Sequence, residues 1–282
     1  VLLPVITNYL RYYLLPDKLV KMYGQDLDNN PSTPNQVRVA VITEQATWAN
    51  SMHAVFTTPA YYGSPTLPSP PYPPGYPNPY YIGPHYNCTY VGRIDPYTVT
   101  DTRPWLDAAE AAGCRLLVII FSAPVGETLI KQWAEGGYHM LPVGINVMSQ
   151  LQTHWITCPG CEYEVTMSTT GTRTAFVPGL SEVFWDHFLG NFSGAWPIYT
   201  AFGAYNALYF MKAALENINE TDITAVKNYL DGVGGSTADV LIPYFEQTRV
   251  TLTTGKFLFT SSPNGPGTVS YTHLTLPTNR EV

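Results

Sequence analysis

Apolar and polar residues follow one another along the chain in blocks that predict alternating strands and helices. Short, mostly apolar runs that predict strands lie at residues 37–43, 90–94, 115–121, 140–144 and 163–167. Segments with helical spacing of apolar residues lie between them, at residues 47–56, 102–112 and 126–135. This alternation predicts an α/β fold with a parallel sheet that helices cover on both faces. The carboxyl ends of the strands then share one edge, where ligands bind in such sheets.

The two ends of the chain are less regular. Residues 11–15 predict a strand that Pro16 ends, and Asp17 begins a helix that runs to about residue 28. Residues 29–35 predict a loop. The last third predicts helices at residues 181–189, 199–216 and 223–230, followed by a strand or hairpin at residues 251–259.

Residues 59–88 interrupt the alternation. Pro, Tyr, Gly and Ser dominate this stretch as far as Pro84. Proline lacks the backbone donor that a strand ladder needs, so the segment predicts a polyproline II-like surface insertion. An extended spacer is the favoured interpretation, and a partner-binding segment is the alternative.

The last residues, 269–282, do not continue the pattern. Residues 270–280 resemble translated adapter sequence, so we expect 269–282 to be a non-native tail and leave it out of the fold prediction. A natural C-terminal tail is the alternative. Genomic coding sequence that continues through Val282 would establish it.

The charge of the chain excludes some classes of partner. Only 12% of the 282 residues are charged, and the net charge is -7. Nucleic acids and anionic membranes would not attract such a chain, so we expect neither as a partner. No window reaches the roughly 18 uninterrupted apolar residues of a membrane-spanning helix. The chain begins at Val1 without an initiator Met or a signal peptide, and we expect it to be a fragment.

The cysteines suggest a disulfide more than a metal site. Cys158 and Cys161 have a spacing that suits metal ligands or a redox pair, and the other cysteines are Cys88 and Cys114. A structural zinc site usually needs a second pair of ligands, and a redox Cys-X-X-Cys opens a helix, whereas a strand-like segment follows here. We therefore expect a local disulfide or turn and no metal site.

Motifs that carry catalytic chemistry are missing. The chain has no HExxH pair, no G-x-S-x-G elbow, no P-loop and no G-x-G-x-x-G after a strand. We therefore expect no catalytic residue and no cofactor, although an α/β enzyme remains the weakest of the alternatives.

Several segments, taken in order, resemble the type I periplasmic binding proteins, in the branch around leucine/isoleucine/valine-binding proteins. These segments are residues 37–49, 105–121, 129–146, 197–207 and 255–259. No single motif is diagnostic, but their order and spacing extend over most of residues 9–265.

The resemblance implies two Rossmann-like lobes with parallel sheets and a hinge, the second lobe complete and the first partial. It assigns residues 1–16 to a hinge or crossover strand, 17–195 to the second lobe with the insertion 59–88, and 196–268 to the returning part of the first lobe. The N-terminal part of such a protein, with half of the ligand site, would be missing.

The resemblance also implies ligand-binding residues. Trp48 matches an aromatic residue that packs on the ligand, and Ser122 and Ala123 match a loop that contacts it. Asn146 matches an acidic residue that pairs with the ammonium of amino-acid ligands. Because Asn146 has no charge, an amide, polyol, sugar-like or aromatic ligand fits equally well. Each position also has a structural alternative: packing for Trp48 and helix capping for Ser122 and Asn146.

The function implied is a solute-capture subunit of an ABC-type importer, which binds a small polar molecule and delivers it to a membrane permease. We expect it outside the cell or in the periplasm, attached to the membrane through a segment absent from this chain. Asn-X-Ser/Thr sequons at Asn87, Asn191 and Asn219 give weak support for export. The ligand-sensing ectodomain of a receptor with the same fold is the main alternative.

Overall fold

The computed structural model describes residues 6–7, 9–13, 16–58, 81–158, 160–166 and 180–218, and the strand segments 250–252, 255–257, 259–261 and 269–271. The chain divides into two compact units. The N-terminal unit comprises residues 2–168, and the C-terminal unit comprises residues 169–282 together with Val1. Most of the predicted insertion and the helix predicted at 223–230 lie outside the described residues.

The N-terminal unit is built on a five-stranded parallel sheet. Its strands are β1 (Val37–Glu44), β2 (Tyr86–Ile94), β3 (Leu116–Phe121), β4 (Leu141–Asn146) and β5 (Val165–Thr166). They lie in the order β2-β1-β3-β4-β5, so the order reverses between β1 and β3. In open α/β sheets this reversal leaves a crevice outside the carboxyl ends of the two strands, where ligands bind.

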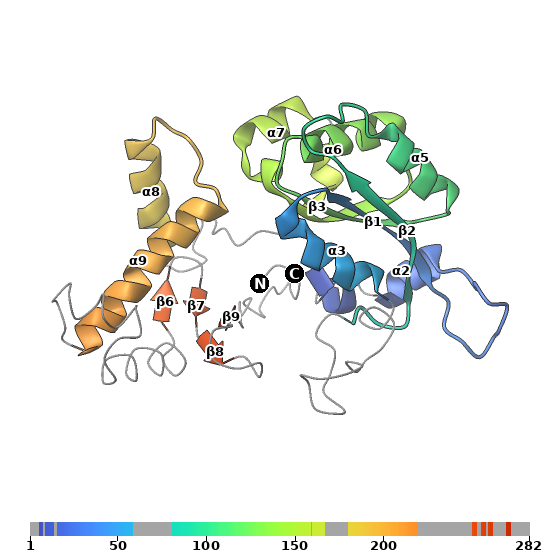
Figure 1. Ribbon diagram of the computed structural model, residues 1–282, viewed down its shortest axis with the longest axis horizontal. Coiled ribbons are helices and arrows are strands. Elements are labelled where there is room, and N and C mark those ends of the chain that lie inside the picture. The colour runs from blue at the N-terminus through green and yellow to red at the C-terminus, as the bar shows by residue number, and fades with distance from the viewer. Residues whose placement is uncertain are drawn as a thin grey trace. The chain divides into compact units, whose positions relative to one another are not determined.

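Helices cover both faces of this sheet (Figure 1). One face carries η1 (Tyr9–Tyr13), α2 (Pro16–Tyr23), η2 (Thr47–Ala49) and α3 (Asn50–Thr57). The other carries α5 (Arg103–Ala111), α6 (Val125–Gly136) and η4 (Cys161–Tyr163). The described part of this unit also contains η3 (Val147–Gln150) and α7 (Gln152–Thr157).

The core follows from the period of two along a strand. In β3, Leu116, Val118 and Ile120 face one helix layer, and Leu117, Ile119 and Phe121 face the other; all six are buried. Because every side chain of β3 is buried, its sequence is a continuous apolar run, which is why this strand was readily predicted.

Three predicted elements differ in the structure. The strand predicted at residues 11–15 is wrong, because Tyr9–Tyr13 form a π-helix; a short apolar run does not distinguish a buried strand from a buried helix. The helix predicted to reach residue 28 ends at Tyr23, because Gln25 leaves it to pair with Gln36. β2 begins at Tyr86, so the last residues assigned to the insertion belong to the sheet.

The C-terminal unit contains α8 (Ser181–Asn191) and α9 (Tyr199–Ile218). Aromatic rings join the two helices: the ring centroids of Phe184 and Phe202 lie 4.5 Å apart. Two antiparallel hairpins follow, β6 (Val250–Leu252) with β7 (Gly255–Phe257) and β8 (Phe259–Ser261) with β9 (Val269–Tyr271). β9 consists of the first residues of the segment that we expected to be a non-native tail. None of the helices in the described ranges is long and apolar enough to cross a membrane.

Candidate functional site

The residues predicted to bind a ligand gather at the carboxyl edge of the parallel sheet. Trp48 lies in η2, shortly after β1 ends at Glu44. Ser122 and Ala123 follow β3, and Asn146 is the last residue of β4. This edge contains the point where the strand order reverses, so the predicted residues lie where an open α/β sheet forms its ligand crevice.

Glu44 connects three of these residues. Its side chain is buried, with 1% of the residue exposed. Oε2 accepts hydrogen bonds from the backbone N–H groups of Ser122 at 2.7 Å and Ala123 at 2.9 Å. Oε1 accepts from the Ser122 hydroxyl at 2.6 Å and from the indole Nε1 of Trp48. A buried carboxylate is expensive unless it is hydrogen-bonded, and here four donors from two segments satisfy it.

This carboxylate therefore links the end of β1 to the loop after β3, at the point where the strand order reverses. It fixes the backbone of the loop between β3 and α6 and the orientation of the Trp48 ring. Trp48 remains 37% exposed, so one part of the ring is held by Glu44 while another part stays open to solvent. The backbone N–H groups of Ser122 and Ala123 both donate to Glu44. The hydrogen bonds of these two groups are therefore made within the protein.

Asn146 serves as the cap of the short helix that follows it. Its Oδ1 accepts from the backbone N of Met148 at 3.2 Å, as the capping alternative predicted. The residue is 1% exposed, and Nδ2 has no hydrogen-bond partner among the residues that the structure describes. A buried amide donor without a partner is unfavourable, so this group remains available for a polar ligand that reaches the edge of β4.

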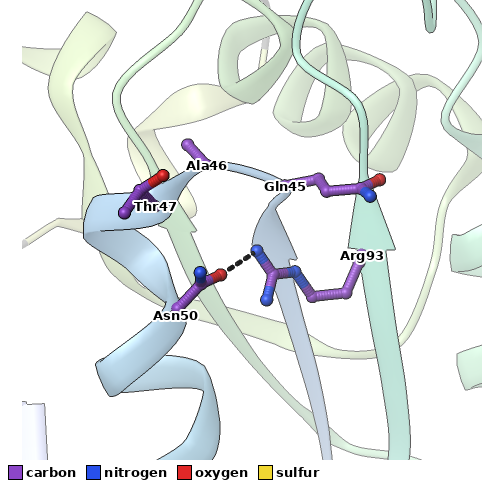
Figure 2. A pocket seen from close by; sticks show the side chains of 5 residues that line it. All are labelled: Gln45, Ala46, Thr47, Asn50 and Arg93. Atoms are coloured by element: carbon purple, nitrogen blue, oxygen red, sulfur yellow. Dashed lines mark hydrogen bonds between the residues drawn. The ribbon is translucent and has the colours of Figure 1, made fainter.

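A pocket of about 360 Å³ opens at the ends of β1 and β2 (Figure 2). Gln45, Ala46, Thr47, Asn50 and Arg93 line it. The size lies in the range that small-molecule sites occupy. None of the predicted ligand-binding residues lines this pocket, although Thr47 is the neighbour of Trp48.

Arg93 supplies the positive charge of the pocket. Nη2 donates to Oδ1 of Asn50 at 2.8 Å and to the backbone oxygen of Glu44 at 3.0 Å, so the guanidinium group joins β2 to β1 and to the start of α3 (Figure 2). Its Nε is buried and has no hydrogen-bond partner within the described ranges. A guanidinium group fixed in this way suits a carboxylate or another acceptor, because its planar donors match such groups.

His53 lies on α3, three residues after the pocket residue Asn50. Its Nδ1 shares a hydrogen bond of 3.0 Å with the hydroxyl of Thr43. Burial lowers the pKa of His53 below its ordinary value of 6.5, and the nearby charge of Arg93 lowers it further. The imidazole is therefore neutral at pH 7, which leaves Arg93 as the cation of this side of the site.

Sequence reasoning gave no role to Glu44, Asn50 or Arg93. For Glu44 a signal was present, because an acidic residue directly at the end of an apolar parallel strand must be buried or lie at the ligand edge. Arg93 is a similar case, since it is the only basic residue in its strand. Asn50 gave no comparable signal, because asparagine is common in the first turns of helices.

Within the described residues, the group of side chains that could hold a metal ion lies elsewhere, at His154, Cys158 and Cys161. Cys158 and Cys161 are joined in a disulfide, with their Cα atoms 5.6 Å apart. Cys88 and Cys114 are free thiols.

Comparison with known proteins places the fold. No family model matches the chain, and no curated protein sequence gives a significant match. An ABC transporter substrate-binding protein from Sphaerobacter thermophilus is similar with a TM-score of 0.56 and 13% identity, over 79% of this chain and 52% of that one. A solute-binding protein of an ABC transporter from R. palustris, in complex with benzoate, has a TM-score of 0.56 and 10% identity, over 95% and 62%.

A leucine-, isoleucine-, valine-, threonine- and alanine-binding protein from Brucella ovis has a TM-score of 0.55 and 14% identity, over 89% of this chain and 52% of that one. At sequence identities this low, the structural similarity establishes the fold alone. The expected α/β fold of the type I periplasmic binding proteins is therefore confirmed. The chain spans 52% to 62% of the length of these solved structures.

Proposed function

We propose that this chain is the ligand-capturing part of an extracellular solute-binding subunit of an ABC-type importer. It binds a small polar molecule at the carboxyl edge of its parallel sheet and performs no chemistry on it. The fold supports this proposal, since two of the similar solved structures are substrate- or solute-binding proteins of ABC transporters and a third is an amino-acid-binding protein. Fold alone does not determine function, so the residues at the carboxyl edge of the sheet have to support the proposal as well.

The observation that carries the proposal is the hydrogen-bonded carboxylate of Glu44. It holds Trp48, Ser122 and Ala123 in one arrangement at the carboxyl ends of β1 and β3. A capture protein gains affinity when its binding surface is rigid before the ligand arrives, because less conformational freedom is then lost on binding. An acid/base catalyst, in contrast, needs a carboxylate that reaches the substrate, and all four hydrogen bonds of Glu44 are made within the protein.

The charges of the site favour an amino-acid-like molecule, an amide or a related small acid. Arg93 can pair with a carboxylate or donate hydrogen bonds to an amide oxygen. Asn146 can satisfy its free Nδ2 on a ligand oxygen but cannot neutralise an ammonium group. The benzoate complex of the R. palustris protein gives one precedent for a small acid in a protein of this fold.

The proposal also implies a place and a partner. Capture proteins of this kind work outside the cell or in the periplasm and deliver their ligand to a membrane permease. The disulfide between Cys158 and Cys161 supports an oxidising compartment, because such bonds persist mainly in exported proteins. We propose that a segment outside this chain attaches the protein to the membrane.

A thermal-shift screen of the full-length protein tests the proposal. The probes are amino acids, their amides, benzoate and other small aromatic acids. A compound that binds only the folded state raises the free energy of unfolding, by about 2.7 kcal/mol when its concentration is a hundred times Kd, and so raises the melting temperature. Arg93→Gln should reduce the shift, whereas Arg103→Gln, at an exposed position on α5, should leave it unchanged. Absence of a shift with every class of compound would contradict small-molecule capture.

A further inference from the structure

A buried cluster of sulfur, nitrogen and carboxylate groups contains none of the residues described above for the ligand edge. It contains His154 at the middle of α7, Cys158 just after that helix, Cys161 in η4, and Glu164. The exposed fractions of these residues are 0%, 2%, 1% and 6%. Side chains of these types are rarely buried together without a partner that satisfies them.

Two polar atoms of this cluster lack a partner. Nε2 of His154 lies 3.1 Å from Oε2 of Glu164, in a fully buried pair. Nδ1 of His154 and Oε1 of Glu164 have no hydrogen-bond partner in the described part of the chain. When the carboxylate is ionised it only accepts, so Nε2 carries the proton and Nδ1 keeps its lone pair. A buried nitrogen lone pair without a donor calls for a ligand.

The distances place this histidine beside the two sulfur atoms. A ring nitrogen of His154 and both Sγ atoms of Cys158 and Cys161 lie within 4.8 Å of one another. Gly160, between the cysteines, has a φ of +87°. A Cβ added to it would lie 2.7 Å from Cβ of Ala134, so the turn that carries the sulfurs is packed tightly against α6.

We propose that these residues form a zinc site when the disulfide is reduced. The ligands are Nδ1 of His154 and the thiolates of Cys158 and Cys161, with a water molecule in the fourth position. Glu164 is a positioning residue that holds the proton on Nε2, an arrangement that is typical of zinc-bound histidine. The sequence offered no second pair of ligands for zinc, whereas the fold brings one further ligand, His154, beside the two cysteines.

Zinc binds after the disulfide between Cys158 and Cys161 is reduced. A dithiol reductant passes two electrons and two protons to the disulfide and becomes a disulfide itself, which leaves two thiols in the protein. Zinc then displaces the two thiol protons to solvent and forms two Zn–S bonds and one Zn–N bond. Because the same sulfurs serve both states, disulfide and metal exclude each other, and the redox state decides which of them ties α7 to η4.

The chemistry of the ligands selects the metal. Thiolates are soft ligands that favour zinc over magnesium or calcium, and a Cys-X-X-Cys pair gives the short sulfur–sulfur separation of tetrahedral zinc sites. The site does not depend on the proposed capture function, since it lies apart from Glu44 and Arg93 in the sequence and uses none of their groups.

Metal content of the oxidised and the reduced chain tests the proposal. The protein is unfolded, reduced with a dithiol, refolded with or without zinc, desalted, and analysed for bound zinc. We expect about one equivalent in the reduced protein and none in the oxidised protein. Cys158→Ala with Cys161→Ala should abolish binding, whereas the matched removal of two thiols at Cys88 and Cys114 should preserve it. Glu164→Gln should weaken zinc affinity by about tenfold or more.

Cobalt provides a readout that needs no variant. Co²⁺ added to the reduced wild-type protein should give a thiolate-to-metal charge-transfer absorption and the intense visible bands of tetrahedral coordination. The proposal is overturned if the reduced protein retains no zinc, if the Cys158/Cys161 variant retains as much as wild type, or if the cobalt spectrum lacks the thiolate band. Circular dichroism of each variant shows that the comparison is made between folded proteins.

Discussion

Glu44 binds Ser122 with both of its carboxylate oxygens, one on the backbone N–H at 2.7 Å and the other on the hydroxyl at 2.6 Å. Glu44 is the last residue of β1 and Ser122 directly follows β3, so they lie on either side of the point where the strand order reverses. The Glu44 side chain thus connects the end of β1 to the loop that follows β3. The loop that follows β3 takes its conformation from this carboxylate.

Glu44→Gln should destabilise the N-terminal unit. The amide keeps one acceptor oxygen and places an NH₂ group against donors that now have no acceptor. Loss of charge-assisted bonds and the unpaired buried donors should lower the free energy of unfolding by about 2–4 kcal/mol. Urea denaturation followed by circular dichroism measures the change.

Glu135→Gln is the matched control for this substitution. Glu135 forms an exposed ion pair with Arg103, and such pairs contribute no more than about 1 kcal/mol. Equal effects of the two substitutions would show that the network around Glu44 does not organise the edge.

The parts of the fold that could be predicted are those whose sequence pattern has one explanation. Residues 116–121 are apolar throughout and had to be a doubly covered strand, which is β3. Tyr9–Tyr13 are mostly aromatic or aliphatic, with Arg11 among them, but a run this short does not distinguish a buried strand from a buried helix. β2 was placed too short, because Asn87 and Thr89 give its first half the look of a loop although it pairs with β1.

The sequence was sufficient to bring the four predicted residues to one edge of the sheet, and their role in ligand binding stays a prediction. Parallel strand order alone brings Trp48, Ser122, Ala123 and Asn146 to one edge, and the sequence was sufficient for that. The sequence did not predict that Trp48, Ser122 and Ala123 donate their hydrogen bonds to Glu44. The hydrogen bonds from Ser122 and Ala123 to Glu44 depend on the register of β1 against β3, which is a tertiary property that no local sequence pattern contains.

Gly144→Ala should be strongly destabilising. Gly144 lies within β4 with a φ of +146°, and a Cβ there would stand 2.1 Å from the backbone oxygen of Ile119 in β3. Backbone groups cannot swing away as a flexible side chain would, so the two strands must separate. We expect a loss of at least about 3 kcal/mol in the free energy of unfolding, measured by urea denaturation.

Gly203→Ala makes the matched comparison. Gly203 lies in α9, and nothing lies within 4 Å of a Cβ added to it. Alanine is the better helix former, so stability should rise by about 1 kcal/mol. A tolerated alanine at position 144 would mean that β3 and β4 are not paired as described.

His53 should make the stability of the protein depend on pH just below neutrality. Burial and the charge of Arg93 lower its pKa in the folded state, whereas the unfolded chain binds a proton at about pH 6.5. The unfolded state therefore binds more protons in this range, and stability falls as the pH is lowered from about 7 towards 5. In His53→Gln the fall should be smaller, as measured by melting temperature across this pH range.

His187→Gln serves as the control for pH dependence, because His187 is an exposed residue of α8. It should reproduce the wild-type pH profile. A wild-type profile in His53→Gln as well would show that this imidazole does not gain its proton at lower pH on folding.

The free thiols should be unreactive in the folded protein. Burial raises the pKa of Cys88 to about 11 and that of Cys114 to about 12. Only the thiolate attacks iodoacetamide, so at pH 8 the reactive fraction should be lower by about two orders of magnitude or more than for an exposed cysteine. Mass spectrometry of the native protein should therefore show slow alkylation at both positions.

The same labelling separates these thiols from Cys158 and Cys161. In denaturant without reductant, Cys88 and Cys114 should react rapidly while the disulfide-bonded pair stays unlabelled. Addition of a dithiol reductant should then bring all four cysteines into the labelled fraction. Rapid native labelling of Cys114 would contradict its burial between β3 and α5, and labelling of Cys158 before reduction would show that the disulfide is not formed in the isolated protein.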